Sequence, residues 1–373
     1  MSDTVAKILT SFDALRSELT HLGPGWSEDP ESDFFCTLDW FENLAQHGFE
    51  AGDVASNVQL LFEMNPSLGL AACLPVLKGN PLGSLSNYYT SLFGPMHWVR
   101  RGLEVKHPDQ AGFHQAAAEG FAALIGKQLP RLSVLRLQPM DLGAVFVSKF
   151  EAALASAGFW TDHYFCFGNW YLKVNQRSFD QYQRSLPSKL QHNIERGARR
   201  LSHQGQLQID VFTDLNAKLA KATADFIAVY QQSWKPPEPR PDFIPGLIAL
   251  AAKKGWLRLG ILRLNGQPIA AQLWLVKSGK ASIFKLAYIA GHDRLSPGTV
   301  LTARLMRHVI DIDKVDEVDY LTGDDSYKKD WMSHRRERWG LLAFKSRSIR
   351  GTFQAIRHFL GKAVRALRRV ATA

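Results

Sequence analysis

The pattern of apolar and polar positions is clearest in the second half of the chain, where two apolar runs flank a short turn. Residues 256–264 and 268–276 have the character of strands, and Asn265 and Gly266 stand between them. An Asn-Gly pair between two such runs indicates a two-residue type I′ hairpin, because both central residues need a positive φ. The sequence therefore predicts two antiparallel strands here.

The residues that follow complete a structural unit. A third strand is expected over 281–290 and a last strand over 317–322, on either side of a run with helical spacing. That run consists of Val300, Leu301, Leu305, Val309 and Ile310. Three antiparallel strands, a helix and a strand beside the third do not form a pure alternation of strands and helices, so a mixed sheet is predicted.

A similar order occurs in the first half of the chain, with little identity in the letters. Its members are strands over 58–64, 68–77, 85–93 and 132–137 and a helix over 113–129. We expect an α+β protein with two domains, 1–175 and 176–345, each a mixed, mainly antiparallel sheet flanked by helices. A basic amphipathic helix over 346–373 is expected to follow them.

Length and composition agree with this organisation. A chain of 373 residues is longer than one hydrophobic core usually serves, and its 46% hydrophobic and 21% charged residues are typical of soluble globular proteins. The longest nearly apolar stretches, 68–77 and 247–252, are shorter than the roughly 20 residues that span a bilayer. The N-terminus also lacks the pattern of a secretory signal, so we expect a cytoplasmic protein.

Cysteine and histidine spacing argues against a disulfide framework and against a metal site. Cys36, Cys73 and Cys166 are odd in number and far apart, without a CxxC pair, and no HExxH or HxxxH spacing occurs. The sequence also lacks the P-loop and nucleophile-elbow motifs. Metal, P-loop and serine-hydrolase chemistry are therefore not expected.

Charge is distributed unevenly along the chain. Residues 1–175 carry 11 basic and 18 acidic side chains (−7), residues 176–345 carry 27 and 17 (+10), and residues 346–373 carry seven basic side chains and no acidic one. We therefore expect only the second half to attract polyanions.

Several segments together carry a resemblance to a known family. They are Ser185-Leu-Pro-Ser-Lys-Leu-Gln-His-Asn-Ile-Glu-Arg196, Gly266-Gln-Pro-Ile-Ala-Ala-Gln272, Ser296-Pro-Gly-Thr299 and Asp319-Tyr-Leu-Thr-Gly-Asp-Asp-Ser-Tyr-Lys-Lys-Asp-Trp331. The chain resembles the CelD-like branch of the GNAT acyltransferase superfamily over about 176–345. That branch is related to the Fem transferases, which carry two GNAT domains and add amino acids from aminoacyl-tRNA to peptidoglycan precursors. The resemblance implies a tandem GNAT fold whose second copy holds the acyl donor, while the first helps to frame the acceptor.

The segment around Ser296 is the candidate donor site. Ser296 and Pro297 have the character of an N-cap and a first helical residue, so the amides of Gly298 and Thr299 would point outward at the positive end of the helix dipole. Such a helix start binds pyrophosphate, and Arg294 in the preceding loop could meet the phosphates of acyl-CoA. The usual GNAT loop has a second glycine that is missing here. An ordinary capped helix is the alternative interpretation.

The segment after the last strand contains the candidate catalytic residues, Asp319, Asp324, Tyr327 and Lys328. The resemblance implies that Tyr327 and Lys328 match the aromatic-lysine pair of the Fem relatives, whose lysine is thought to stabilise the negative charge that develops in acyl transfer. Asp319 or Asp324 would take the proton from the attacking amine or orient it. Alternatively, the aspartates cap a turn and the lysine is solvated.

The candidate acceptor side comprises a predicted helix over 187–203 and a tryptophan. The helix carries a basic stripe that includes Lys189 and Arg196, with Asn193 between them, and would suit a nucleotide, a tRNA backbone or a lipid-linked sugar pyrophosphate. Trp234 precedes a proline-rich loop and could form a platform for a sugar ring or an acyl chain. A solvated basic face and a core tryptophan are the alternatives.

These observations predict an N-acyltransferase that moves an acyl group from acyl-CoA to an amine, on a small molecule or a lipid-linked sugar of the cell envelope or of an exopolysaccharide. A transferase that uses aminoacyl-tRNA and a non-catalytic assembly factor for polysaccharide synthesis are the alternatives. The apolar stripe and seven cations of 346–373 further predict binding at the anionic inner face of the membrane, with a packed terminal helix as the alternative.

Overall fold

The computed structural model describes residues 4–371 apart from 51, 55, 102–109 and 130, and it describes no side chains for 110, 111, 128 and 365–371. The chain forms two compact units. Unit 1 comprises Met1–Cys166 with Glu337–Ala373, and unit 2 comprises Phe167–Arg336. The division falls inside two long strands, β8 (Phe159–Lys173) and β14 (His334–Lys345). The sequence predicts the division at 175/176 instead, since nothing in the apolar pattern of a strand marks where its neighbouring strands change.

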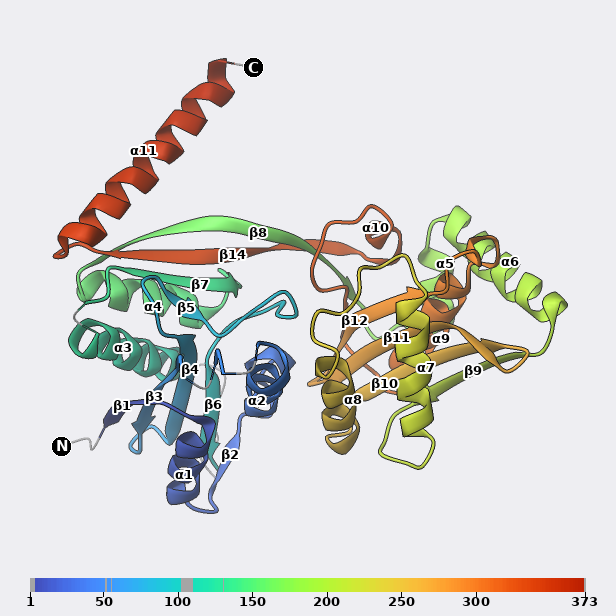
Figure 1. The fold of residues 1–373 in the computed structure, drawn as a ribbon, viewed down its shortest axis with the longest axis horizontal. Helices are drawn as coiled ribbons and strands as arrows, with labels where there is room; N and C mark the ends of the chain where they lie inside the picture. Colours follow the sequence, from blue (N-terminus) through green and yellow to red (C-terminus); the bar gives the residue numbers. More distant parts are fainter. Residues whose placement is uncertain (1–3, 51, 55, 102–109, 130, 372–373) are drawn as a thin grey trace. The chain divides into compact units, whose positions relative to one another are not determined.

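Unit 1 is a mixed sheet with helices packed on it (Figure 1). Its elements are β1 (Val5–Leu9), α1 (Phe12–Leu22), β2 (Trp26–Glu28), the 3-10 turn η1 (Phe34–Cys36), α2 (Leu38–His47), β3 (Val58–Asn65), β4 (Leu70–Leu77), β5 (Leu82–Ser84), β6 (Met96–Arg100), α3 (Gln110–Gln128), β7 (Val134–Met140), α4 (Val145–Ser156) and α11 (Ile349–Ala371), with parts of β8 and β14. The order across the sheet is β1-β3-β4-β5-β7-β14, and β6 and β2 extend it from β4. Strands β5 and β7 are parallel, and the other described pairs in this unit are antiparallel.

The strand that the sequence predicted over 85–93 does not form. Its place is taken by two short strands, β5 and β6, which lie on either side of it in the sequence and both pair with β4. Within the loop, the side chain of Asn87 accepts a hydrogen bond from the amide of Tyr89 and donates one to the carbonyl of Gly48. These bonds hold the backbone in a turn, so Leu85, Tyr89 and Phe93 are buried without belonging to a sheet.

Unit 2 repeats the same principle, with one parallel pair in an otherwise antiparallel sheet. Its elements are the end of β8, α5 (Phe179–Ser185), α6 (Ser188–Gln204), β9 (Leu207–Phe212), α7 (Leu219–Gln231), α8 (Phe243–Lys253), β10 (Leu257–Leu264), β11 (Gln267–Lys277), β12 (Lys280–Tyr288), the 3-10 turn η3 (Asp293–Leu295), α9 (Pro297–Asp311), β13 (Glu317–Asp319), α10 (Lys328–Trp331) and the start of β14. The order is β8-β13-β12-β11-β10-β9, and among these described strand pairs β12–β13 is parallel and the others are antiparallel. The predicted α+β class, with mixed, mainly antiparallel sheets flanked by helices, is confirmed.

The β10–β11 turn has the predicted conformation. Asn265 and Gly266 have φ values of 51° and 79°, and Leu264 pairs with Gln267 directly across the turn. A positive φ at both central positions is what a type I′ turn requires, and it is why Asn and Gly stand there.

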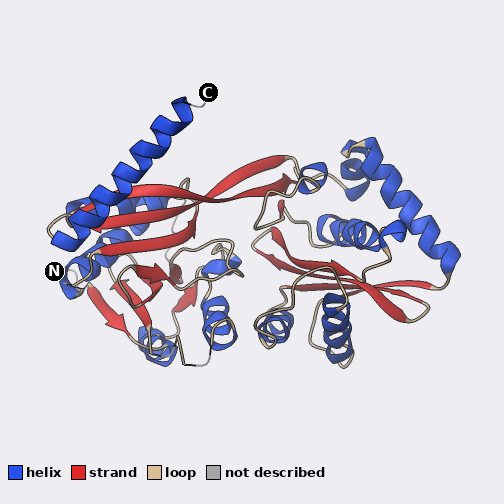
Figure 2. Cartoon of the chain, turned by 45° about the horizontal axis from the view of Figure 1, so that its top comes forward, coloured by secondary structure: helices blue, strands red, loops and turns tan. Residues whose placement is uncertain are grey.

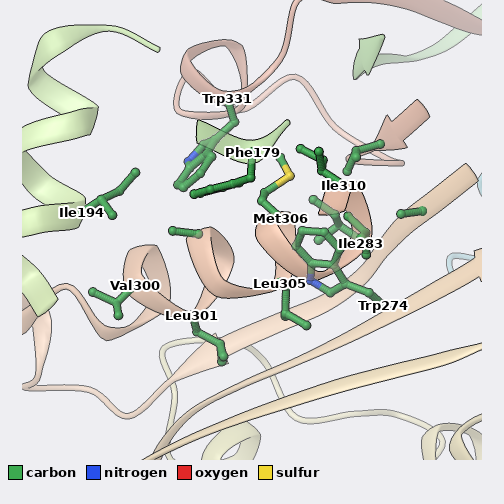
Figure 3. Close-up of a cluster of buried hydrophobic side chains, with 14 of the residues drawn as sticks. Phe179, Ile194, Trp274, Ile283, Val300, Leu301, Leu305, Met306, Ile310 and Trp331 are labelled. Carbon is green, nitrogen blue, oxygen red and sulfur yellow. The ribbon is translucent and has the colours of Figure 1, made fainter. Parts of the chain in front are cut away.

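Helix α9 forms the centre of the unit 2 core. The five apolar residues that the sequence placed on one helical face are all buried, and they pack with Trp274 and Ile283 of the sheet (Figure 3). Figures 1 and 2 show α9 and α6 on one face of the sheet and α7 and α8 on the other. Helix α6 approaches α9 closely at Gly197, where an added Cβ would lie 2.9 Å from Val300 and 3.1 Å from the carbonyl of Leu295. Glycine at 197 therefore sets the distance between the two helices.

No helix in the described part of the chain is both long and apolar enough to cross a membrane.

The core of unit 1 contains a buried carboxyl group. Glu63 of β3 faces α3 at Gly120, where an added Cβ would collide with the carboxyl, and the side chain is 3% exposed. Its Oε2 has no hydrogen-bond partner among the described residues. Burial, together with the nearby carboxylate of Glu119, raises the pKa of Glu63 to about 7. Because the native state binds this proton more tightly than the unfolded chain, the stabilisation is present at low pH and is lost as the pH rises through 7.

We therefore predict that unit 1 loses about 1–3 kcal/mol of its free energy of unfolding between pH 5 and pH 8 through this group. Glu63→Gln should remove that part of the pH dependence and be the more stable protein at pH 8. Urea unfolding at the two pH values measures the effect. The control is Glu31→Gln, which changes an exposed carboxyl of the same unit. A Glu63→Gln protein with the wild-type pH dependence would contradict the prediction.

Candidate active site

The start of α9 has the predicted position but not the predicted capping. Pro297 is the first helical residue and Ser296 precedes it, as expected, but the Ser296 side chain accepts no hydrogen bond from the helix. Ser296 has φ 53° and ψ 44°, in the left-handed region, whereas a side chain that caps a helix extends from a backbone in the β region. The backbone conformation thus prevents the cap that its residue type suggested.

Without that cap, the first amides of α9 remain open. No hydrogen bond is made by the amides of Gly298 and Thr299 within the described part of the chain, and both residues are partly exposed. Arg294, in the turn η3 just before them, is exposed. Open amides and a helix dipole favour an anion at this point. Gly298 also lies close to a ring, because an added Cβ would be 3.1 Å from Cδ1 of Tyr288.

An aromatic pair covers the loop that leads into α9. The hydroxyl of Tyr288 donates to Oδ1 of Asp293 at 2.7 Å, and the ring of Trp234 lies 4.4 Å from the Tyr288 ring, centroid to centroid. The amide of Ala290 donates to the carbonyl of Gln232, which joins the end of β12 to the segment before Trp234. Trp234, which is 55% exposed, is therefore placed beside the predicted donor loop. The sequence had no signal for this proximity.

Gln272 was missed by the sequence analysis and is central to the geometry of the site. Its side-chain amide is fully buried and donates to the carbonyl of Gly298 at 3.0 Å and to Oγ1 of Thr302 at 2.8 Å, while its oxygen accepts from Nε1 of Trp274. These bonds fix the first turn of α9 against β11. A glutamine within the apolar run 268–276 was the available signal, because a buried amide needs dedicated partners.

A cavity of about 280 Å³ lies in unit 2 between α7, α8 and the proline-rich loop. Its lining residues are Phe226, Ile227, Tyr230, Gln231, Lys235, Pro237, Glu238, Pro241 and Ile244. Glu238 forms an ion pair with Lys285, and both side chains are 14% exposed. Burial and a hydrogen bond with Glu238 raise the pKa of Tyr230, so its hydroxyl remains protonated. The cavity thus combines apolar walls with one fixed carboxylate and one lysine.

Lys235, which lines this cavity, has a lowered pKa. Burial first, and then the charges of Lys285 and Lys328, lower its pKa to about 8, against the opposing effect of Asp325 and Glu238. A lysine with a pKa near the working pH can exchange a proton with a substrate. The same electrostatic interactions link this cavity to the segment around Lys328.

Lys328 is buried, and its ammonium group binds to backbone carbonyls and a carboxylate of the neighbouring loop. Nζ donates to the carbonyl of Thr322 at 2.6 Å and to that of Gly323 at 3.3 Å, and it lies 3.1 Å from Oδ2 of Asp325. An ammonium has three donors, and these acceptors occupy all three. The neighbouring Tyr327 is 44% exposed, and burial and the nearby Asp325 raise the pKa of its hydroxyl to about 12. The contacts of Lys328 favour a role in holding the loop 322–325.

Asp319 and Asp324 are both paired with arginines. Asp319 is 1% exposed and accepts hydrogen bonds from Asn169, the amide of Leu321 and Arg336. Burial alone would raise the pKa of Asp319, but Lys280, Arg336 and these hydrogen bonds lower it to about 2. The exposed Asp324 is held by Nε and Nη2 of Arg335, and this hydrogen bonding lowers its pKa. Neither carboxylate is poised to accept a proton near neutral pH, so the contacts favour positioning roles.

The sheet opens beside these residues. Strands β12 and β13 pair only at 280–282 with 317–319. The chain then follows β8, because the amide of Tyr320 donates to the carbonyl of Trp170 and Gly323 pairs with Asn169. A register shift between Leu273 and Trp274 adds one residue to β12 just where it leaves β13, as in a β-bulge. The end of β12 therefore diverges from the segment 320–323.

The candidate acceptor residues of α6 lie along a helix that packs on the donor loop. Leu190, Ile194 and Leu201 are buried toward the core, whereas Lys189 and Arg196 are exposed and Asn193 is half-buried. Another residue of the basic stripe, Arg200, donates from Nη1 to the carbonyl of Arg294 at 2.8 Å. The predicted donor loop and the predicted basic helix are thus in contact.

Among the residues that the structure describes, no group of three or more His, Cys, Asp or Glu side chains could hold a metal ion.

Comparisons with known proteins place this geometry in context. The family model described as acetyltransferase (GNAT) domain matches residues 188–329. That range contains α6, the cavity, the start of α9 and Lys328. No curated protein matches the chain.

Solved structures resemble the chain over most of its length. FemX is 10% identical, with a TM-score of 0.53, and the match covers 94% of this chain and 99% of FemX. A conserved protein of unknown function from Bacteroides thetaiotaomicron is 9% identical, with a TM-score of 0.53, covering 91% of this chain and 100% of that one. A tandem GNAT protein from the clavulanic acid biosynthesis pathway is 11% identical, with a TM-score of 0.40, covering 85% and 97%.

Residues 188–329 thus match a GNAT domain, and the fold of the chain is similar to that of FemX. At these identities the structural likeness concerns the fold, while the resemblance to the CelD-like branch stays a prediction.

The contacts of Lys328 generate a prediction about stability. Lys328→Met should lower the free energy of unfolding of unit 2 by about 1–3 kcal/mol, because the carbonyls of Thr322 and Gly323 would lose their donor. Lys329→Met is the matched control, since it removes an exposed charge at the next position and should change stability by less than about 0.5 kcal/mol. Urea unfolding of the two variants measures the difference. Equal stabilities would show that Lys328 does not hold the loop, and its predicted catalytic role would regain support.

Proposed function

We propose that the protein is an N-acyltransferase that transfers an acyl group from acyl-CoA to an amine, at a site in unit 2. The observation that carries this proposal is the start of α9, where the open amides of Gly298 and Thr299 adjoin the aromatic pair Tyr288 and Trp234. The match of residues 188–329 to the acetyltransferase (GNAT) domain supports it.

The donor is proposed to bind with its pyrophosphate at these amides. Arg294 adds a cation next to them, and the absence of a side chain at Gly298 lets the Tyr288 ring lie against the start of the helix. The thioester end would enter where β12 diverges from the segment 320–323, which leads toward Lys235 and the cavity. Trp234 offers an exposed ring along this route.

The acceptor amine is proposed to bind in the cavity of about 280 Å³ lined by Tyr230, Lys235 and Glu238. Glu238 would orient the amine, and neutral Lys235 would accept its proton. The amine nitrogen then attacks the thioester carbonyl carbon, the C–N bond forms as the C–S bond breaks, and the thiolate of coenzyme A leaves and is protonated from solvent. An amino sugar, free or linked to a lipid, is the acceptor class that we infer for an envelope or exopolysaccharide precursor.

The donor site is tested by Gly298→Glu. The introduced carboxylate would lie at the amides and repel the pyrophosphate, so the Kd for coenzyme A should rise at least about tenfold. Isothermal titration calorimetry measures the change. Leu215→Glu, which adds the same charge at a residue of unit 2 that is 67% exposed, should bind coenzyme A like the wild type. A folded Gly298→Glu protein with unchanged affinity would place the pyrophosphate elsewhere.

The role of Lys235 is tested by the pH dependence of turnover. If neutral Lys235 is the base, kcat/KM rises with pH and levels off above about 8, the pKa that burial and the neighbouring lysines give it. Lys235→Met should lower kcat by about 10²–10⁴ and abolish this dependence, and Lys235→Arg should also be inactive because arginine keeps its proton. Thiol release from acetyl-CoA with an amino-sugar acceptor measures the rate, and the exposed Lys329→Met is the control. A Lys235→Met enzyme with the wild-type pH profile would remove this residue from the mechanism.

A second candidate is a Fem-like transferase that uses aminoacyl-tRNA. The basic face of α6, with Lys189 and Arg196 exposed, and the fold shared with FemX favour it. Calorimetry of the wild type with acetyl-CoA, a longer acyl-CoA and tRNA separates the candidates. Binding of tRNA alone favours the second one, and binding of none of the three favours a non-catalytic assembly factor.

A further inference from the structure

Helix α11 of unit 1 presents an apolar face to solvent. Figure 1 shows the helix running from the end of β14 with most of its length clear of the other elements of unit 1. Ile349, Phe353, Ile356, Leu360 and Val364 are 94%, 65%, 53%, 61% and 47% exposed. Their spacing of three or four residues places them on one side of the helix, because successive residues turn by about 100°. Isolated exposed apolar side chains are common on protein surfaces, but a continuous row of five requires an explanation.

The opposite side of the same helix is anchored to unit 1. His358 and Lys362 both contact Asp162 of β8, at 2.7 Å. Ala355 is buried with Phe344 and Val134, and Gly351 lies so close to β14 that an added Cβ would be 2.4 Å from the carbonyl of Lys345. These anchored residues are about half a turn away from the apolar row. The contacts therefore hold the helix with its apolar face directed away from the body of unit 1.

A groove along one edge of the apolar face is lined by cations. Its volume is about 630 Å³, and Arg136, Arg350 and Arg357 line it together with Phe353 and Phe344. No carboxylate lines this groove in the described part of the chain. Guanidinium groups recognise phosphate through paired hydrogen bonds, so the groove suits the phosphate of a lipid headgroup.

The other edge of the face is apolar and aromatic. An open groove of about 800 Å³ runs between α11 and the start of β8, and Trp160, Phe159, Phe359 and Leu360 line it. Trp160 is 46% exposed. Tryptophan is favoured where an apolar environment meets a polar one, as at the surface of a bilayer.

We propose that α11 docks unit 1 on an anionic membrane surface, with the row Ile349, Phe353, Ile356, Leu360 and Val364 among the acyl chains and the groove of Arg136, Arg350 and Arg357 on lipid phosphates. Charge complementarity favours an anionic lipid surface as the partner of this face, because residues 346–373 contain seven basic and no acidic side chains. A second copy of the chain fits this face less well, because two such faces would bring their arginines together without acidic partners.

The experiment is vesicle flotation with the full chain. Protein should float with vesicles that contain about 30 mol% phosphatidylglycerol and stay unbound with pure phosphatidylcholine, and raising NaCl from about 0.1 to 0.5 M should weaken binding. The double variant Ile356→Glu/Leu360→Glu should lower the bound fraction at least about tenfold, and Arg350→Gln/Arg357→Gln should remove the preference for the anionic lipid. Leu68→Glu, an exposed apolar residue of unit 1 outside the face, is the control.

Circular dichroism should show every variant folded, because the substituted side chains are exposed. Wild-type protein that does not float with anionic vesicles would overturn the proposal, as would an Ile356→Glu/Leu360→Glu protein that floats like the wild type. Light scattering without lipid tests the second copy. A wild-type dimer that becomes a monomer in this variant, without vesicle binding, would overturn the proposal and assign the face to self-association.

Discussion

The buried pairing of Asp319 with Arg336 and Asn169 is the interaction on which the geometry of unit 2 depends. It holds the end of β13 against β8, and the chain beyond it continues along β8 through Tyr320 and Gly323. In the described part of the chain, β12 pairs with β13 only up to Ser282, and beyond it the two strands separate. A charge in an apolar core is costly unless it is paired, and here the complete pairing of Asp319 keeps the opening of the sheet in place.

Charge placement around this opening distinguishes three lysines. Lys328 and Lys285 are each held close to protein acceptors, Lys328 by loop carbonyls and Asp325, and Lys285 by Glu238. Lys235 lies within the electrostatic influence of both and has a lowered pKa. Burial first, and then these fixed cations, lower the pKa of Lys235 to about 8 and make it a weaker base than a solvated lysine.

The two units share one order of strands and helices, but the functional groups that this order positions differ between them. In both, antiparallel strands precede a helix and a final strand that pairs in parallel, as β7 does with β5 and β13 with β12. In unit 2 the start of the corresponding helix α9 has open amides. In unit 1 the corresponding helix α3 covers the buried Glu63, and the outward apolar face of the unit belongs to α11. The shared pattern of elements therefore does not imply a shared site.

The local chemistry of the chain could be predicted from its sequence, and the environment of each side chain could not. The Asn265-Gly266 hairpin, the buried face of α9 and the helix start at Pro297 were predictable, because turn residues, apolar spacing and proline act over a few residues. The segment 85–93 was predicted as a strand and is a loop, in which Leu85, Tyr89 and Phe93 are buried by packing and not by pairing in a sheet. Only the tertiary structure decided that Lys328 faces carbonyls, that Asp319 is saturated by a residue 17 positions away and another 150 positions away, and that Lys235 and Gln272 belong to the site. These outcomes depend on which polar and charged groups come together in the protein interior, where the low dielectric constant strengthens their interactions. The linear sequence does not specify the distances between these groups.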